Sequence, residues 1–172
     1  RVGLAIAIFS LTAGSTYWLL REWQLRRTAE RVAERFVQAL LDGDVRAAHQ
    51  ITLPPKLRFP TDQPLADSYR DHAAARDALA KFSEDALVKE LVGREAKITR
   101  TAVQWHESHR GGEGFGVTVE SWEDQGESAP EFALSLLVEQ TTDQADPGWV
   151  VTRYSSKGKF VTRSGRKTLE DR

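Results

Sequence analysis

The sequence predicts an α+β protein: an N-terminal transmembrane helix, followed by helices packed on a curved four-stranded antiparallel sheet. Three observations carry this prediction. An uncharged apolar run occupies residues 2–20, and amphipathic helical patterns fill much of the chain up to Gly93. Four segments rich in β-branched and aromatic residues then follow, separated by turn residues. Helices first and strands second is typical of α+β domains rather than of alternating α/β folds.

The apolar run from Val2 to Leu20 contains no charged residue. At about 1.5 Å per helical residue it reaches about 28 Å, close to the ~30 Å hydrocarbon core of a bilayer. We expect an uncleaved single-pass anchor over residues 1–21, with a cleavable signal peptide and a buried core helix as alternatives. The residues expected to lie in lipid or at the headgroup level are Leu4, Ile6, Ile8, Phe9, Leu11, Tyr17, Trp18, Leu19, Leu20 and Trp23.

The charges that follow this run do not decide its orientation. Five arginines lie shortly after Leu20, and the positive-inside rule places such a flank in the cytoplasm. Interspersed glutamates, however, indicate ion pairs within one helix, such as Glu22–Arg26 and Arg27–Glu30.

The helical pattern continues without a break beyond the apolar run. In "TAERVAERFVQALLDGD", apolar residues recur at three- and four-residue steps, so we expect the anchor to continue into the first helix of the body. Gly43 ends that helix, and Asp44 caps a second one from Val45 to about Ile51. The segment "LPPKLRFPTDQP" is expected to be extended, and a third helix is predicted from Leu65 to Val92.

The chain after Gly93 predicts four strands. They correspond to "AKITRTAVQWHESHR", "GFGVTVESWED", "EFALSLLVEQTTD" and "GWVVTRYSSK". Apolar residues alternate within the second and third of them, as expected for strands with one buried face. Because the connections are short, neighbouring strands are expected to be antiparallel and to form a meander.

This order of elements resembles the NTF2-like (cystatin-like cone) superfamily. The residues that carry the resemblance are "AERFVQALLDGDVRAAHQI" and the four closing strands ending in "GWVVTRY". The resemblance implies an NTF2-like domain over residues 22–155, followed by a basic tail over residues 156–172. Membrane-tethered members, such as VirB8-like assembly subunits of type IV secretion and Mce-associated proteins, have one N-terminal span before this domain. The closing Asn-Pro-x-Gly feature of the VirB8-like proteins is absent, and the subfamily stays open.

No arrangement of residues in the sequence predicts catalysis. His106 and His109 invite a metal interpretation, but residues three apart on a strand point to opposite faces, so a solvated strand end is expected. His49 and His72 lie singly on helices and are expected at the surface or at its boundary with the core. The expected interior positions are bulky and mostly unable to transfer protons, which favours a filled core: Trp105, Phe115, Trp122, Phe132 and Tyr154. We therefore expect no enzyme activity, cofactor or metal ion.

Charge and composition set further limits. The net charge is −1 and cysteine is absent, which excludes disulfides and gives no global attraction to nucleic acid. The acidic residues between Glu113 and Glu131 are expected to form a solvated face. The basic tail has two interpretations, a solvated terminus or an arm that docks on an acidic partner or anionic lipid. The partner-binding candidates are Arg153, Lys157, Lys159, Phe160, Arg163, Arg166 and Lys167.

These expectations favour a non-catalytic accessory or assembly subunit of a larger membrane complex. Its partners would be the lipid bilayer and other subunits of that complex, and not nucleic acid. The resemblance implies a bacterial inner (cytoplasmic) membrane and a periplasmic domain, with the cytoplasmic side left open. The alternative is a membrane-anchored small-ligand-binding protein or enzyme that uses a cone-shaped pocket.

Overall fold

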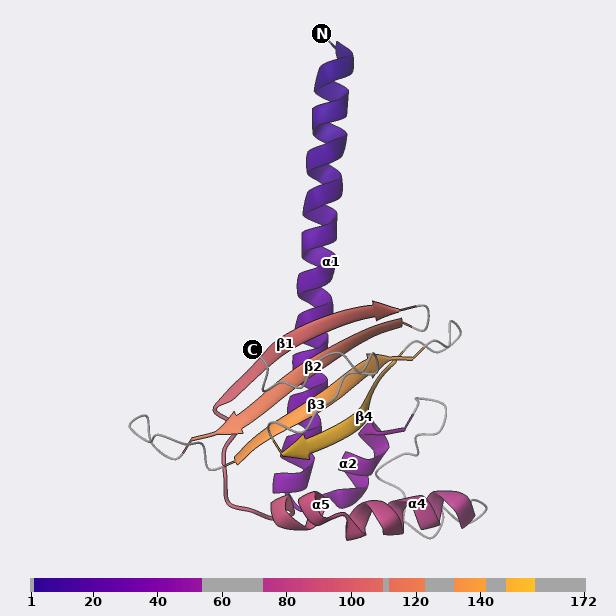
Figure 1. Cartoon of the computed structure of the whole chain (residues 1–172), viewed down its shortest axis with the longest axis vertical. Coiled ribbons are helices and arrows are strands. Elements are labelled where there is room, and N and C mark those ends of the chain that lie inside the picture. Colours follow the sequence, from indigo (N-terminus) through magenta and orange to yellow (C-terminus); the bar gives the residue numbers. More distant parts are fainter. Residues whose placement is uncertain (1, 54–72, 110–111, 123–131, 142–147, 157–172) are drawn as a thin grey trace.

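The computed structural model shows an α+β protein in which one long helix, α1, crosses a four-stranded antiparallel sheet (Figure 1). The structure describes residues 2–53, 73–109, 112–122, 132–141 and 148–156; among these, the side chains of residues 2–15, 73–75 and 109 are not described. The predicted fold class is therefore confirmed at the level of helices followed by an antiparallel sheet.

Helix α1 runs from Val2 to Leu41 without interruption. This confirms that the apolar run and the first amphipathic segment form a single helix. The C-terminal half of α1 contacts all four strands, and Figure 1 shows its N-terminal half extending beyond β1, away from the sheet. The stripe that α1 buries contains Ala29, Ala33, Phe36, Val37 and Leu40, all fully inaccessible to solvent.

The turn after α1 forms as the sequence predicts. Gly43 has a φ of +78°, which a glycine adopts without steric cost, and this conformation ends the helix. Asp44 is the N-cap of α2 (Val45–Ile51), because its Oδ1 accepts a hydrogen bond from the backbone N–H of Ala47 at 2.8 Å. The tight turn places α2 directly against the end of α1.

The prediction of one helix from Leu65 to Val92 was wrong. The structure has two shorter helices, α4 (Ala73–Glu84) and α5 (Ala86–Leu91), and residues 65–72 lie outside the described residues. The break occurs at Asp85, whose extended backbone and side chain cap α5: its Oδ1 accepts from the N–H groups of Leu87 and Val88 at 2.9 and 3.3 Å. Aspartate is favoured at the N-cap of a helix over the helix interior. The prediction missed this break because the apolar periodicity continues across it.

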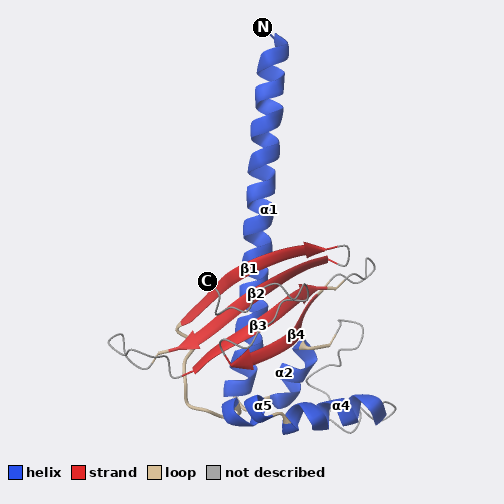
Figure 2. Cartoon of the chain, viewed as in Figure 1, coloured by secondary structure: helices blue, strands red, loops and turns tan. Residues whose placement is uncertain are grey.

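The sheet is a meander in the order β1–β2–β3–β4, as predicted. Its strands are β1 (Arg100–His109), β2 (Gly112–Ser121), β3 (Phe132–Gln140) and β4 (Trp149–Ser156), and every neighbouring pair is antiparallel. The register shifts between Val103 and Trp105 and again between Leu137 and Val138. Figure 2 shows the strands curving as they cross α1, and bulges of this kind bend strands.

The core lies between α1 and the sheet. Phe115 and Phe132 are buried, as predicted, while Trp105, Trp122 and Tyr154 are only half-buried. Rings from three elements meet at the lower end of the core: Phe36 lies 6.2 Å from Phe82 and 5.4 Å from Tyr154, measured between ring centroids. The space between helix and sheet in the described part of the chain is thus filled by large side chains.

Within the part of the chain that the structure describes, no helix combines the length and the apolar character that crossing a membrane requires. Five of the ten residues predicted to form the anchor have side chains outside the description: Leu4, Ile6, Ile8, Phe9 and Leu11. The other five, from Tyr17 to Trp23, are described and are considered below.

Candidate functional site

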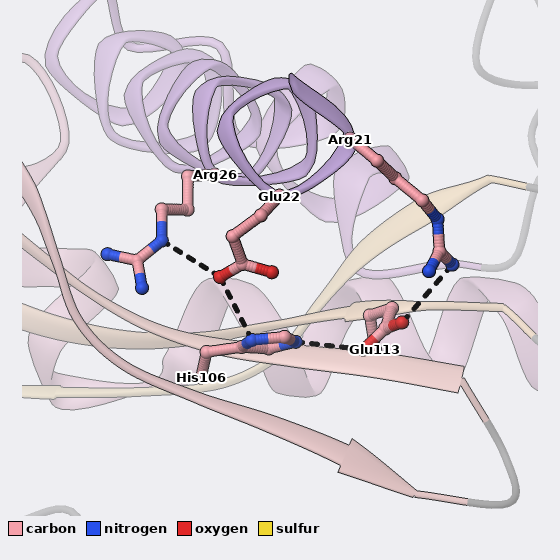
Figure 3. A network of polar contacts seen from close by, with 5 residues as sticks. All are labelled: Arg21, Glu22, Arg26, His106 and Glu113. Atoms are coloured by element: carbon pink, nitrogen blue, oxygen red, sulfur yellow. Dashed lines mark hydrogen bonds and ion pairs between the residues drawn. The ribbon is translucent and has the colours of Figure 1, made fainter. Parts of the chain in front are cut away.

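The most distinctive polar feature of the described residues is a chain of ion pairs where α1 meets the edge of the sheet. It joins Arg21, Glu22 and Arg26 of α1 to His106 of β1 and Glu113 of β2 (Figure 3). We call these five residues the His106 network. Its helix members Arg21, Glu22 and Arg26 precede the stripe that α1 buries against the sheet, which begins at Ala29.

Strand pairing brings the sheet members of this network together. His106 is opposite Phe115 in the β1–β2 register, and Glu113 precedes Phe115 by two residues. Because side chains on a strand alternate between faces, Glu113, Phe115 and His106 all point toward α1. The helix then supplies Glu22 from above, as Figure 3 shows.

The imidazole of His106 is held between two carboxylates. Its Nε2 lies 2.8 Å from Oε2 of Glu113, and its Nδ1 lies 3.1 Å from Oε1 of Glu22. The same oxygen of Glu22 accepts a hydrogen bond from Nε of Arg26 at 3.0 Å. On the other side, Arg21 donates to Oε1 of Glu113 at 3.4 Å. Each carboxylate therefore has one arginine and one imidazole nitrogen as neighbours.

Aromatic packing fixes the orientation of the imidazole. The ring of His106 is stacked on Phe115, with centroids 4.3 Å apart and planes 2° from parallel. Phe115 is fully buried and also contacts Trp149 of β4, at 5.6 Å. The stacking leaves the two ring nitrogens facing sideways toward Glu22 and Glu113, so the direction of both contacts is set by the core.

The surroundings of Glu113 favour its ionised form. Burial by itself raises the pKa of this carboxyl, but hydrogen bonds from His106 and Ser108, together with the charges of His106 and Arg21, lower it below its ordinary value. Glu113 is therefore an anion over the neutral pH range, although only 9% of its surface is exposed.

The arrangement suits a structural role better than proton transfer to a substrate. A general base needs a free ring nitrogen within reach of the substrate, and both nitrogens of His106 already face carboxylate oxygens. In the described residues, no group of three or more His, Cys, Asp or Glu side chains is arranged to hold a metal ion. What the His106 network does, by its geometry, is connect α1 to two strands.

A second feature lies on α1 beside this network. Five consecutive or nearly consecutive large side chains are more than half exposed: Tyr17 (72%), Trp18 (60%), Leu19 (61%), Leu20 (55%) and Trp23 (57%). We call them the α1 apolar cluster. The Arg27 guanidinium lies 5.7 Å from the ring centroid of Trp23 and pairs with Glu30, so a cation borders the cluster. Large apolar side chains exposed together in this way are typical of a contact surface.

Several sequence predictions about single residues were wrong. His106 was expected at a solvated strand end, and Glu113 and Glu120 on a solvated acidic face, but Glu113 and Glu120 are buried and His106 is mostly covered. His49, expected at the surface or at its boundary with the core, is only 3% exposed. All four are covered through contacts between segments distant in sequence. The Glu22–Arg26 and Arg27–Glu30 pairs were predicted correctly, because their spacing alone specifies them.

The structure describes few of the predicted partner-binding residues. Arg153 is exposed on β4. The other six, Lys157, Lys159, Phe160, Arg163, Arg166 and Lys167, lie outside the described residues, as do His72 and the acidic residues from Glu123 to Glu131.

No protein-family model, curated protein or solved structure matches this chain.

Proposed function

We propose that this protein is a non-catalytic accessory subunit of a bacterial membrane complex, which presents its body at a fixed distance from the membrane through α1. The observation that carries the proposal is the α1 apolar cluster, which precedes the stripe of the same helix that is buried against the sheet. Isolated exposed apolar side chains are ordinary on a protein surface, whereas five together at the exit of a helix are not.

The continuity of α1 supports a fixed geometry. One helix contains both the uncharged sequence from Val2 to Leu20 and the stripe that packs on the sheet, so no flexible linker separates them. Tyr17, Trp18 and Trp23 have amphipathic rings, which are favoured at the level of lipid headgroups. In this proposal residues 1–21 are the membrane attachment, and the body is periplasmic.

The filled core supports an accessory role over the alternative of ligand binding or catalysis. Phe36, Leu40, Phe115 and Leu136 are fully buried and belong to one continuous core, whereas a ligand pocket needs open space between the helix and the sheet. We also propose an NTF2-like relationship, which is supported by the order of two helices, a helical pair and a four-stranded meander. The basic tail remains a proposed site for an acidic partner.

The proposal is tested in membranes of cells that express the full chain. A photo-reactive amino acid at position 18 or 23 is expected to give discrete cross-links to one or a few subunits of one complex, or to lipid. The matched control places the same amino acid at Arg76, an exposed position on α4 outside the α1 apolar cluster. Equal cross-linking from all three positions, or recovery of the chain in the soluble fraction, would contradict the proposal.

A second variant tests the attachment directly. Replacing Trp18, Leu19 and Leu20 with serine is expected to release the chain from membranes washed with alkaline carbonate. The control replaces three exposed polar side chains of the same helix, Gln24, Arg31 and Arg35, with serine and is expected to stay bound. Circular dichroism of both proteins shows whether the body still folds.

A further inference from the structure

We propose that the Glu22–His106–Glu113 arrangement is a proton-dependent clasp, which holds α1 on the edge of the sheet when His106 carries a proton on both ring nitrogens and loosens when it loses one. This inference goes beyond the proposed function, because it concerns the attachment of α1 to its own sheet and requires neither a membrane nor a partner.

A neutral imidazole has one N–H donor and one lone pair, whereas the protonated ring has two donors. Here both nitrogens lie within 3.1 Å of carboxylate oxygens, one from α1 and one from β2. Carboxylates can only accept when ionised, so the neutral ring satisfies one of them and turns a lone pair toward the other. Only the imidazolium is complementary to both.

Rotation of the neutral ring does not provide a donor for both carboxylates. Stacking on Phe115 at 4.3 Å and 2° holds its plane, and a half-turn of the ring would still direct one nitrogen toward each side. Glu113 is buried and its lowered pKa keeps it ionised, so it does not take up a proton at neutral pH. The contact to the buried Glu113 is the shorter one, at 2.8 Å against 3.1 Å, so in this proposal the single N–H of the neutral ring stays with Glu113 and the contact to Glu22 weakens. The contact to Glu22 joins β1 to α1.

The charged groups around the ring come from every element that contacts it in the described structure. From α1 these are Glu22 and, next to the carboxylates, Arg21 and Arg26; from β2 the group is Glu113. The two arginines balance the two carboxylates.

The clasp lies along α1 between an exposed N-terminal part and the part that is buried against the sheet. After the network residues of α1, the helix is buried against the sheet through Ala29, Ala33 and Phe36, whereas the residues before them, from Tyr17 to Leu20, are exposed. The His106 network joins α1 to β1 and β2 before the buried stripe begins (Figure 3), so its loss is expected to let the N-terminal part of α1 change direction relative to the sheet without unfolding the core.

The test measures the distance between α1 and β1 by pulsed electron paramagnetic resonance of the full chain. The sequence has no cysteine, so spin labels attach only at the introduced Gln24→Cys on α1 and Gln104→Cys on β1, both exposed positions. At about pH 5.5 we expect one narrow distance distribution. At about pH 8.5 we expect loss of part of that population to broader, longer distances.

Three variants in the same labelled background make the result decisive. His106→Gln offers one donor and one acceptor at all pH values. Its distance distribution is expected to be broad at both pH values. For Glu22→Gln, a narrow distance distribution is expected at both pH values, because the amide N–H can donate to the lone pair of a neutral His106. His49→Gln, which changes a histidine away from the His106 network, is expected to behave like the unchanged protein. An absent pH response in the unchanged protein, or the same response in His106→Gln, would overturn the proposal.

Discussion

The indole of Trp105 lies directly over Gly116, its partner on the neighbouring strand, and occupies the space that a Cβ at position 116 would take. Gly116 is thus required for packing on the face of the sheet away from α1. The register shift between Val103 and Trp105 is what places the indole there.

Replacing Gly116 with alanine is therefore expected to destabilise the protein by about 1–3 kcal/mol, the usual cost of overpacking. Urea denaturation measures the free energy of unfolding. In a Trp105→Ala background the same change should cost much less, because the overlapping indole is gone. If the two substitutions are simply additive, the indole does not occupy this position in solution.

Replacing Phe115 with leucine should cost about 1 kcal/mol of stability, since a buried ring is exchanged for a smaller apolar side chain. The change also removes the flat surface on which His106 is stacked. We expect the distribution of distances between α1 and β1 to broaden even in weakly acidic solution. Phe132→Leu is the control: Phe132 is a buried residue of the same core, and its replacement should lower stability while leaving that distance narrow.

Replacing Asp44 with alanine should destabilise the protein by about 1 kcal/mol, because α2 loses its N-cap hydrogen bond to Ala47. Asp44→Ser, which can still accept that bond, should retain most of the stability. Thermal unfolding followed by circular dichroism compares the two. Equal losses in both variants would show that the cap is not the source of the effect.

His49 makes the protein sensitive to acid. Burial lowers the pKa of this imidazole, whose Nδ1 has no hydrogen-bond partner in the described structure, so the folded protein holds it neutral. The unfolded chain binds the proton at higher pH, and stability is expected to fall as the pH drops below about 6.5. His49→Leu should reduce this loss, as measured by urea denaturation at pH values on both sides of that range. An unchanged acid response would exclude His49 as its cause.

Tyr154 should ionise only in strongly alkaline solution. Burial, and secondly the charge of Asp85, raises the pKa of its phenol to about 12. Because the unfolded chain releases this proton near pH 10, stability should decrease as the pH rises from about 10 toward 12. The difference in ultraviolet absorbance between the unchanged protein and Tyr154→Phe isolates this titration. Asp85→Asn should move it to lower pH, and no movement would show that Asp85 has no influence.

Local patterns determined much of this fold. The uninterrupted helical period from Val2 to Leu41, the stop at Gly43 and the cap at Asp44 depend on neighbours within a few residues, so the sequence alone predicts them. The same is true of the four strands, whose short connections require an antiparallel meander. The break at Asp85 was missed because an apolar pattern continues across it, although an aspartate before a helical segment is a recognisable cap signal.

Only the tertiary structure decided the candidate site. Glu22 and Glu113 are far apart in the sequence, and neither the helical period nor the strand alternation relates one to the other. Both contact His106 because α1 packs across β1 and β2 at one particular level, which is set by the burial of Phe36, Val37 and Phe115. Periodicity specifies which face of an element is apolar, whereas the polar residues that meet at the edge of that face depend on how the two elements are docked.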